Sequence, residues 1–137
     1  MQGKFPSTRL RRNRMKEFSR RLVSENTLSV NDLILPLFVC EGNKVDEPIN
    51  SMPGISRYSI DKLLNQVEKA VKFNIPAIAI FPQIESDLKN SEGSLAVDEN
   101  NLVCRSIKSI KKKFPNIGII CDVALDPFTD HGHDGLV

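Results

Sequence analysis

Three apolar runs, each bounded by polar segments, stand out along the chain at residues 33–40, 75–81 and 117–125. Short, nearly continuous apolar runs are typical of strands that are buried on both faces, as in parallel sheets. Pro36 argues mildly against a central position for the first run, because proline has no N–H to donate to a neighbouring strand. The pattern therefore predicts three buried strands.

Between these runs, apolar residues recur at intervals of three and four, which is the period of an amphipathic helix. The spacing predicts one helix from residue 60 to about 73, with Ser59 as its N-cap, and a second helix over residues 102–114. Residues 41–59 and 83–100 are polar and predict long loops, which often carry function in α/β proteins. The order strand, helix, strand, helix, strand predicts right-handed βαβ units and a parallel sheet.

Carboxylates gather at the end of the third apolar run. Because alternate side chains of a strand share a face, Asp122, Ala124 and Asp126 are expected on one face of this strand. Two carboxylates at the end of a buried strand are costly unless a site uses them. Asp134 follows eight residues later and is expected to fold back over the strand end. The alternative is ordinary turn chemistry, in which Asp126-Pro127 simply ends the strand.

Two architectures fit this order of elements, a doubly wound sheet and a (β/α)₈ barrel. No glycine-rich phosphate loop follows any predicted strand, which argues against a nucleotide-binding sheet. The acidic cluster lies at the carboxyl end of a strand, where barrel enzymes place their sites. A barrel needs about 250 residues. The predicted fold is therefore α/β, with the N-terminal arm and first three strands of a TIM barrel. The chain ends after the apolar Leu136 and Val137, which predicts an interrupted sequence with an open edge strand.

The net charge of +2 hides a basic arm on an acidic body. Residues 1–22 hold eight basic residues and one acid, whereas the remaining 115 residues hold 11 basic and 16 acidic residues. Such an arm can reach a nucleic acid, a membrane surface or another copy of the same protein. We expect the arm at residues 1–30 and a partial barrel at residues 31–137. The arm has no apolar stretch typical of a secretory signal, although its arginine-rich composition resembles a transit peptide. No apolar run approaches the roughly 20 residues that span a membrane.

Three cysteines, Cys40, Cys104 and Cys121, are far apart in the sequence and form no CxxC pair. Their spacing favours reduced, buried thiols in a cytoplasmic protein over a zinc site made of these three residues.

Recognisable motifs stand at residues 9–14, 32–39, 48–49, 51–54, 93–94, 122–129 and 131–135. Through these motifs the chain resembles the porphobilinogen synthase family, also called 5-aminolevulinate dehydratases, over nearly all of its length. It implies a (β/α)₈ barrel whose arm wraps a neighbouring subunit of a homo-octamer. It also implies condensation of two 5-aminolevulinate molecules to porphobilinogen, with loss of two waters, in tetrapyrrole biosynthesis. The two Schiff-base lysines and the lid of the family lie beyond Val137, so these 137 residues alone are expected to be inactive.

The resemblance also bears on the metal. Zinc-dependent members bind a catalytic zinc through three cysteines, and Ala124, Asp126 and Asp134 stand at those positions here. Thiolates suit zinc, whereas carboxylates suit magnesium. The chain thus resembles the aspartate-rich, zinc-independent branch, for which we expect no catalytic zinc. That branch often uses a regulatory Mg²⁺ whose main ligands lie outside this chain. Asp130 stands where Ser or Thr is common in the family, and no role is assigned to it.

The candidate catalytic residues are Asp122, Asp126 and Asp134. A lysine must be neutral to attack a carbonyl, and carboxylates beside it can hold a substrate ammonium group and move protons. Asp126 and Asp134 are expected to replace the electrostatic role of zinc at the second substrate. His131 and His133 are alternative metal ligands, but a loop histidine beside glycine is more often solvated or hydrogen-bonded.

Two other functions remain open from the sequence. One is a non-catalytic, basic-armed module for nucleic-acid binding or assembly, with steeply salt-dependent binding. The arm offers Phe5 and Phe18 as its aromatics and no stacking platform, so a subunit-embracing arm without nucleic acid or membrane is favoured. The other is a different barrel lyase with an aspartate site, which would not turn over 5-aminolevulinate.

Overall fold

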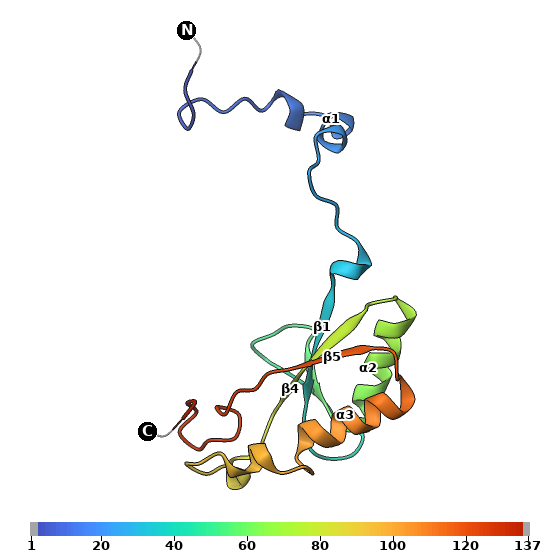
Figure 1. The fold of residues 1–137 in the computed structure, drawn as a ribbon, viewed down its shortest axis with the longest axis vertical. Helices are drawn as coiled ribbons and strands as arrows, with labels where there is room; N and C mark the ends of the chain where they lie inside the picture. The colour runs from blue at the N-terminus through green and yellow to red at the C-terminus, as the bar shows by residue number, and fades with distance from the viewer. Residues whose placement is uncertain (1–2, 136–137) are drawn as a thin grey trace.

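The computed structural model describes residues 3–135 (Figure 1). Leu136 and Val137, whose apolar character suggested an interrupted sequence, lie outside these residues. The strands are β1 (Ile34–Val39), β2 (Asp46–Pro48), β3 (Ser56–Tyr58), β4 (Ala77–Pro82) and β5 (Gly118–Cys121). The helices are α1 (Glu17–Leu22), α2 (Ile60–Lys72) and α3 (Leu102–Lys113), with short 3₁₀ turns at Arg12–Arg14, Val30–Asp32, Ser86–Leu88 and Ser94–Val97.

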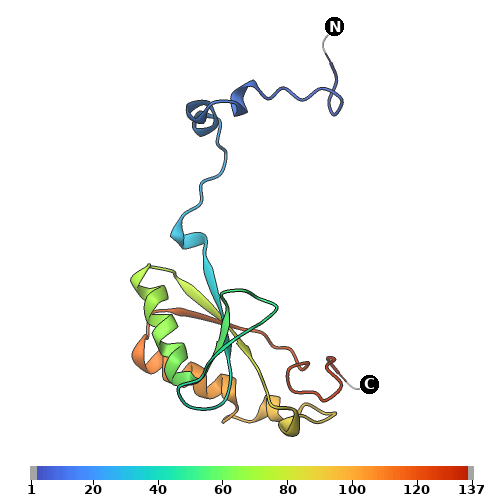
Figure 2. The same ribbon diagram turned by 180° about the vertical axis from the view of Figure 1, so that it is seen from behind.

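The strands form one sheet in the order β2-β3-β1-β4-β5, in which β1, β4 and β5 are parallel neighbours in chain order. Helices α2 and α3 lie on the same side of this sheet in both opposed views (Figures 1 and 2). A doubly wound sheet reverses its strand order and carries helices on both faces. The arrangement is therefore that of part of a (β/α)₈ barrel, as the sequence predicted.

The core lies between the sheet and the two helices. Leu37 and Ile80, which pair in the register of β1 and β4, are both buried against this helical layer. Burial of such side chains is the main stabilising term for this part of the fold. On the opposite face, Ile34 and Ile120 remain 53% and 46% exposed. In a barrel, this opposite face is the interior.

Pro36 lies in the central strand β1, a position that the sequence had counted mildly against. The N–H of Cys40 donates to the carbonyl of Tyr58, so even-numbered residues of β1 direct their backbone groups toward β3. Strand β3 pairs only with Phe38 and Val39 and does not reach Pro36. The missing N–H of Pro36 therefore costs no hydrogen bond within the described sheet.

The third parallel strand is shorter than predicted, because β5 ends at Cys121 rather than at residue 125. Cys121 pairs with Ile80, so a longer β5 would place its next residues opposite Phe81 and Pro82. The carbonyl of Pro76 accepts the N–H of Gly118, which shows that even-numbered residues of β4 face β5. Pro82 faces β5 without an N–H to donate, and the ladder stops before it.

Two further details differ from the prediction. The loop predicted over residues 41–59 contains the short antiparallel pair β2 and β3. Ser59 stands at the N-cap of α2, but its hydroxyl accepts the N–H of Val45 at 2.9 Å and donates to the Asp61 carboxylate at 2.6 Å. The hydrogen bond from Ser59 is the main cause that lowers the pKa of Asp61. Ser59 therefore joins the loop to the helix instead of capping the helix with its side chain.

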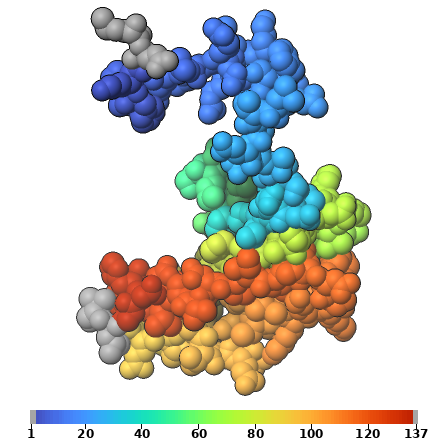
Figure 3. All heavy atoms as spheres, turned by 45° about the horizontal axis from the view of Figure 1, so that its top comes forward, coloured from blue at the N-terminus to red at the C-terminus, as the bar shows by residue number. Residues whose placement is uncertain are grey.

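Residues 3–29 extend away from the body of the molecule (Figures 1 and 3). Neither α1 nor the turn Arg12–Arg14 contains a buried residue. Ser29 begins the turn Val30–Asp32 through a capping box with Asp32. In the part of the chain that the structure describes, no helix is both long enough and apolar enough to cross a membrane.

Candidate active site

A cavity of about 540 Å³ opens where β1, β4 and β5 end. Phe38 and Phe81 form part of its wall, with ring centroids 5.7 Å apart and planes inclined by 35°. The segment from Cys121 to Phe128 forms another part of the wall. Since sites in barrel enzymes lie at the carboxyl ends of the strands, this cavity is the candidate active site.

Asp122, Ala124 and Asp126 all line this cavity, so the structure brings together the residues that the sequence singled out. The reason given for their common face was wrong, because they follow β5 instead of continuing it. Val123, which strand alternation would put on the opposite face from Asp122, also lines the cavity although the residue is 99% exposed. An irregular segment, rather than strand alternation, therefore presents these carboxylates.

Asp134 folds back over the end of the strand, as predicted, but its side chain meets the backbone. Its Oδ1 atom accepts the N–H groups of Leu125 at 2.5 Å and Asp126 at 3.1 Å. A carboxylate that accepts two backbone N–H groups makes charge-assisted hydrogen bonds, which are stronger than neutral ones. Asp134 therefore fixes the backbone from which Asp126 projects.

The histidines and Asp130 take part in the same loop. The rings of His131 and His133 stack with centroids 6.1 Å apart, and His131 Nε2 lies 3.2 Å from the carbonyl oxygen of Ser91. The backbone N–H of Asp130 donates to the carbonyl of Asn90 at 3.2 Å. These contacts join the loop after β5 to the loop after β4.

The donor side chains of residues 3–135 decide whether this part of the chain can hold a metal ion. Within this range, no group of three or more His, Cys, Asp or Glu residues is placed to hold a metal ion. Ala124, which stands at one of the expected zinc positions, has no donor atom in its side chain. The described residues alone do not supply a site for Mg²⁺.

The cysteines are not assembled into a ligand set within the described chain either. Burial is the main cause that raises the pKa of the thiols of Cys40 and Cys121. Both thiols are thus held in their neutral form to a higher pH than a solvated cysteine. Cys104 and Cys121 contribute to the wall of the cavity.

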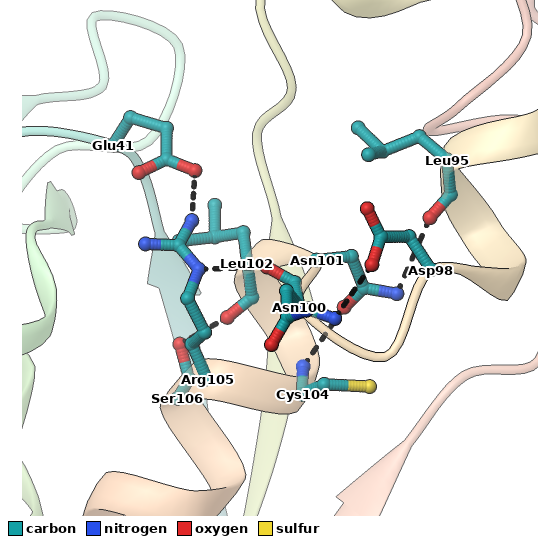
Figure 4. Close-up of polar contacts among 9 residues, drawn as sticks. All are labelled: Glu41, Leu95, Asp98, Asn100, Asn101, Leu102, Cys104, Arg105 and Ser106. Atoms are coloured by element: carbon teal, nitrogen blue, oxygen red, sulfur yellow. Dashed lines mark hydrogen bonds and ion pairs between the residues drawn. The ribbon is translucent and has the colours of Figure 1, made fainter.

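A network of polar contacts at the start of α3 supports one wall of the cavity (Figure 4). Asn101 caps the helix by accepting the N–H of Cys104 at 2.8 Å, and its Nδ2 atom donates to the carbonyl of Ala96 at 3.1 Å. Arg105 pairs with Glu41, which follows β1, and donates from Nε to the carbonyl of Asn100 at 2.9 Å. The network attaches the first turn of α3 to the loops at the carboxyl ends of the strands.

The sequence pattern did not indicate that Phe38 and Phe81 would line the cavity or that Asn90 would pair with Thr129. The two phenylalanines hold equivalent places, each one residue before the end of its strand, and a parallel register would have aligned them. The parallel bridge between Asn90 and Thr129 joins two irregular loops. No periodicity or motif in the sequence marks that contact.

Comparison with known proteins gives a consistent result. A family model described as delta-aminolevulinic acid dehydratase matches residues 7–137. The chain is 54% identical over 129 residues to the delta-aminolevulinic acid dehydratase of Bradyrhizobium diazoefficiens, covering 94% of this chain and 36% of that protein. It is 45% identical over 130 residues to the enzyme of the same name from Chlamydia pneumoniae, covering 95% of this chain and 39% of that protein.

Among solved structures, the chain is similar to a delta-aminolevulinic acid dehydratase (porphobilinogen synthase) from Toxoplasma gondii, in complex with the reaction product porphobilinogen. The TM-score is 0.86 at 40% sequence identity, and the match covers 95% of this chain and 37% of that one. The chain thus spans 36% to 39% of the length of these three relatives.

Proposed function

This chain belongs to the delta-aminolevulinic acid dehydratase family, and we propose that it supplies the acidic part of the active site of such an enzyme. The whole protein would condense two 5-aminolevulinate molecules to porphobilinogen, with loss of two waters, in tetrapyrrole biosynthesis. The observation that carries the proposal is the cavity at the carboxyl ends of β1, β4 and β5, which Asp122 and Asp126 line.

The proposed chemistry begins with the charge of these carboxylates. 5-Aminolevulinate carries an ammonium group, which a carboxylate can bind and from which it can accept a proton. Phe38 and Phe81 border the cavity with apolar rings, and charge interactions are stronger beside apolar walls than in bulk water. We assign substrate binding and proton transfer to Asp122 and Asp126.

Asp134 is the third proposed catalytic carboxylate, beside Asp122 and Asp126. Its Oδ1 atom holds the N–H groups of Leu125 and Asp126, so the Asp134 charge lies next to the Asp126 backbone. We infer that Asp126 and Asp134 together take over the electrostatic role that zinc has at the second substrate in zinc-dependent members of the family. No catalytic zinc is proposed, and a regulatory Mg²⁺ would take its main ligands from residues outside 3–135.

The test is the rate of porphobilinogen formation by the complete protein that carries this segment. The protein should turn over 5-aminolevulinate, and treatment with the zinc chelator 1,10-phenanthroline should leave the rate unchanged. No porphobilinogen from the complete protein would contradict the proposed activity. A loss of activity that only Zn²⁺ restores would contradict the zinc-independent assignment.

We also propose that residues 1–30 embrace a neighbouring subunit in a homo-octamer. The support is that the arm exposes large apolar side chains alongside its basic residues. Leu10 is 93% exposed, and Phe5, Met15, Phe18, Leu22 and Leu28 are also exposed. So many large apolar side chains exposed along one segment favour a protein partner, whereas phosphate binding needs charge alone. Deleting residues 1–29 from the complete protein should lower the number of subunits per particle in analytical ultracentrifugation, and an unchanged number of subunits would contradict the proposal.

A further inference from the structure

The loop that carries Asp126 and Asp134 rests on the loop that follows β4. Asn90 forms a parallel bridge with Thr129, in which Asn90 N–H donates to the Phe128 carbonyl at 3.4 Å and Asp130 N–H donates to the Asn90 carbonyl at 3.2 Å. Thr129 is only 1% exposed. The docking is close, since a Cβ atom at Gly93 would lie 3.3 Å from Thr129 Cγ2. The first loop therefore acts as a base for the acidic loop.

His131 makes a second link between these loops, and its two ring nitrogens have different partners. Nε2 lies 3.2 Å from the carbonyl oxygen of Ser91, and Nδ1 lies 3.3 Å from the backbone nitrogen of His133. A carbonyl can only accept and a backbone N–H can only donate. These contacts assign Nε2 as the donor to the Ser91 carbonyl and Nδ1 as the acceptor from His133.

The contacts of His131 lead directly to the carboxylates. The His133 carbonyl, in the turn that His131 holds, accepts the hydroxyl of Thr129 at 2.9 Å. Asp134 follows immediately and accepts the N–H groups of Leu125 and Asp126. The connection thus runs by hydrogen bonds from Ser91 through the imidazole to His133, along the backbone to Asp134, and by hydrogen bonds again to the backbone of Asp126.

We propose that His131 is a positioning residue, which ties the acidic loop to Ser91 and thereby sets the place of Asp126 and Asp134 in the site. The effect of His131 on catalysis rests on the proposed function. Its structural consequence, the order of residues 125–134, is independent of that function. A small displacement of a catalytic group is costly, because a shift of about 1 Å can lower a rate about a hundredfold.

Three substitutions separate the two contacts. His131→Ala removes both. His131→Gln keeps an N–H donor near the place of Nε2, so it can still reach the Ser91 carbonyl. His131→Asn keeps an acceptor near the place of Nδ1, so it can still hold the N–H of His133 in the same turn. The comparison between Gln and Asn therefore isolates the bond between the loops.

The variants are compared in the complete protein by two measurements. The first is the kcat and KM for porphobilinogen formation from 5-aminolevulinate. The second is amide hydrogen exchange in peptides that cover residues 122–135, which reports local opening without reference to activity. We expect His131→Ala to lower kcat about tenfold to a hundredfold with a smaller change in KM, and to speed exchange. His131→Gln should restore most of both effects, and His131→Asn should restore less.

Two results would overturn the proposal. One is unchanged exchange and unchanged kcat in His131→Ala, which would show that the imidazole does not hold the loop. The other is equal behaviour of the Gln and Asn variants, which would show that the bond to Ser91 contributes nothing. If the unsubstituted protein forms no porphobilinogen, the proposed function fails, and the exchange measurement still decides whether His131 positions the loop.

Discussion

Removing the Asp134 carboxylate should loosen the backbone on which Asp126 stands. Asp134 Oδ1 accepts two backbone N–H groups, from Leu125 and Asp126. Hydrogen bonds to a charged group contribute about 1.5–3 kcal/mol each in protected sites, and the exposure of Asp134 reduces this to roughly 1 kcal/mol each. Asp134→Ala should therefore ease local opening by about 2 kcal/mol, which corresponds to roughly 30-fold faster exchange of these two amides.

Asp134→Asn is the matched variant, because the asparagine side-chain oxygen can accept the same two N–H groups without a charge. Its effect on exchange should stay below about tenfold, since only the charge-assisted part is lost. If the charge also acts in the reaction, turnover of Asp134→Asn in the complete protein should fall about a hundredfold, the size typical of an acid–base group.

The assay is amide hydrogen exchange of Leu125 and Asp126, followed together with porphobilinogen formation. Asp130→Ala is the control, since the part of Asp130 that contacts Asn90 is its backbone. Unchanged exchange of Leu125 in Asp134→Ala would refute the structural reasoning. Normal turnover in Asp134→Asn would show that Asp134 serves the loop and not the chemistry.

Three further predictions follow from the core and the thiols. Ile80→Ala, at a residue 1% exposed, should lower the free energy of unfolding by about 2–5 kcal/mol in urea titration, whereas Val97→Ala, at a residue 86% exposed, should change it by less than about 0.5 kcal/mol. Gly118→Ala should lower the free energy of unfolding by about 1–3 kcal/mol, because the new Cβ would lie 3.0 Å from Ala77 Cβ. Equal urea midpoints for the variant and the unsubstituted protein would contradict this expectation. Because burial raises the pKa of the Cys121 thiol, its alkylation near neutral pH should be slower than that of a solvated cysteine. The stability linked to this thiol should be present below the ordinary pKa of 9.0 and be lost as pH rises through the raised pKa. Alkylation at the rate of a solvated thiol would contradict the raised pKa, on which both expectations depend.

The parts of the fold that local burial determines could be predicted from the sequence. The apolar periods of α2 and α3 and the runs of β1 and β4 are each a direct record of which side chains meet the core. Their order along the chain predicted a parallel sheet with right-handed connections. The missing glycine-rich loop and the acidic cluster at the carboxyl end of a strand then favoured a barrel over a doubly wound sheet.

The end of β5 and the pair β2 and β3 could not be predicted, because they depend on partners that are distant in sequence. Strand β5 stops where Pro82 of its neighbour has no N–H to give, and the apolar pattern of β5 itself does not record this. Strands β2 and β3 have three residues each and are largely polar. Their stability comes from mutual pairing and from the contact of β3 with β1.

For the site, the sequence predicted which residues gather but not how they are held. Asp122 and Asp126 line the cavity as expected, although through an irregular segment. Asp134 returns to the strand end, yet its partners are backbone N–H groups that every residue has, so side-chain types could not identify them. The place of His131 between Ser91 and His133 likewise depends on two loops that meet only in the folded chain.

The central claim is that the carboxylates beside the cavity carry out the chemistry of porphobilinogen formation. The most direct measurement is kcat at saturating 5-aminolevulinate for Asp126→Asn in the complete protein, with Asp130→Asn as a control that removes the same charge from the same loop. We predict a loss of at least about a hundredfold for Asp126→Asn and little change for the control. A near-normal kcat for Asp126→Asn would contradict the account.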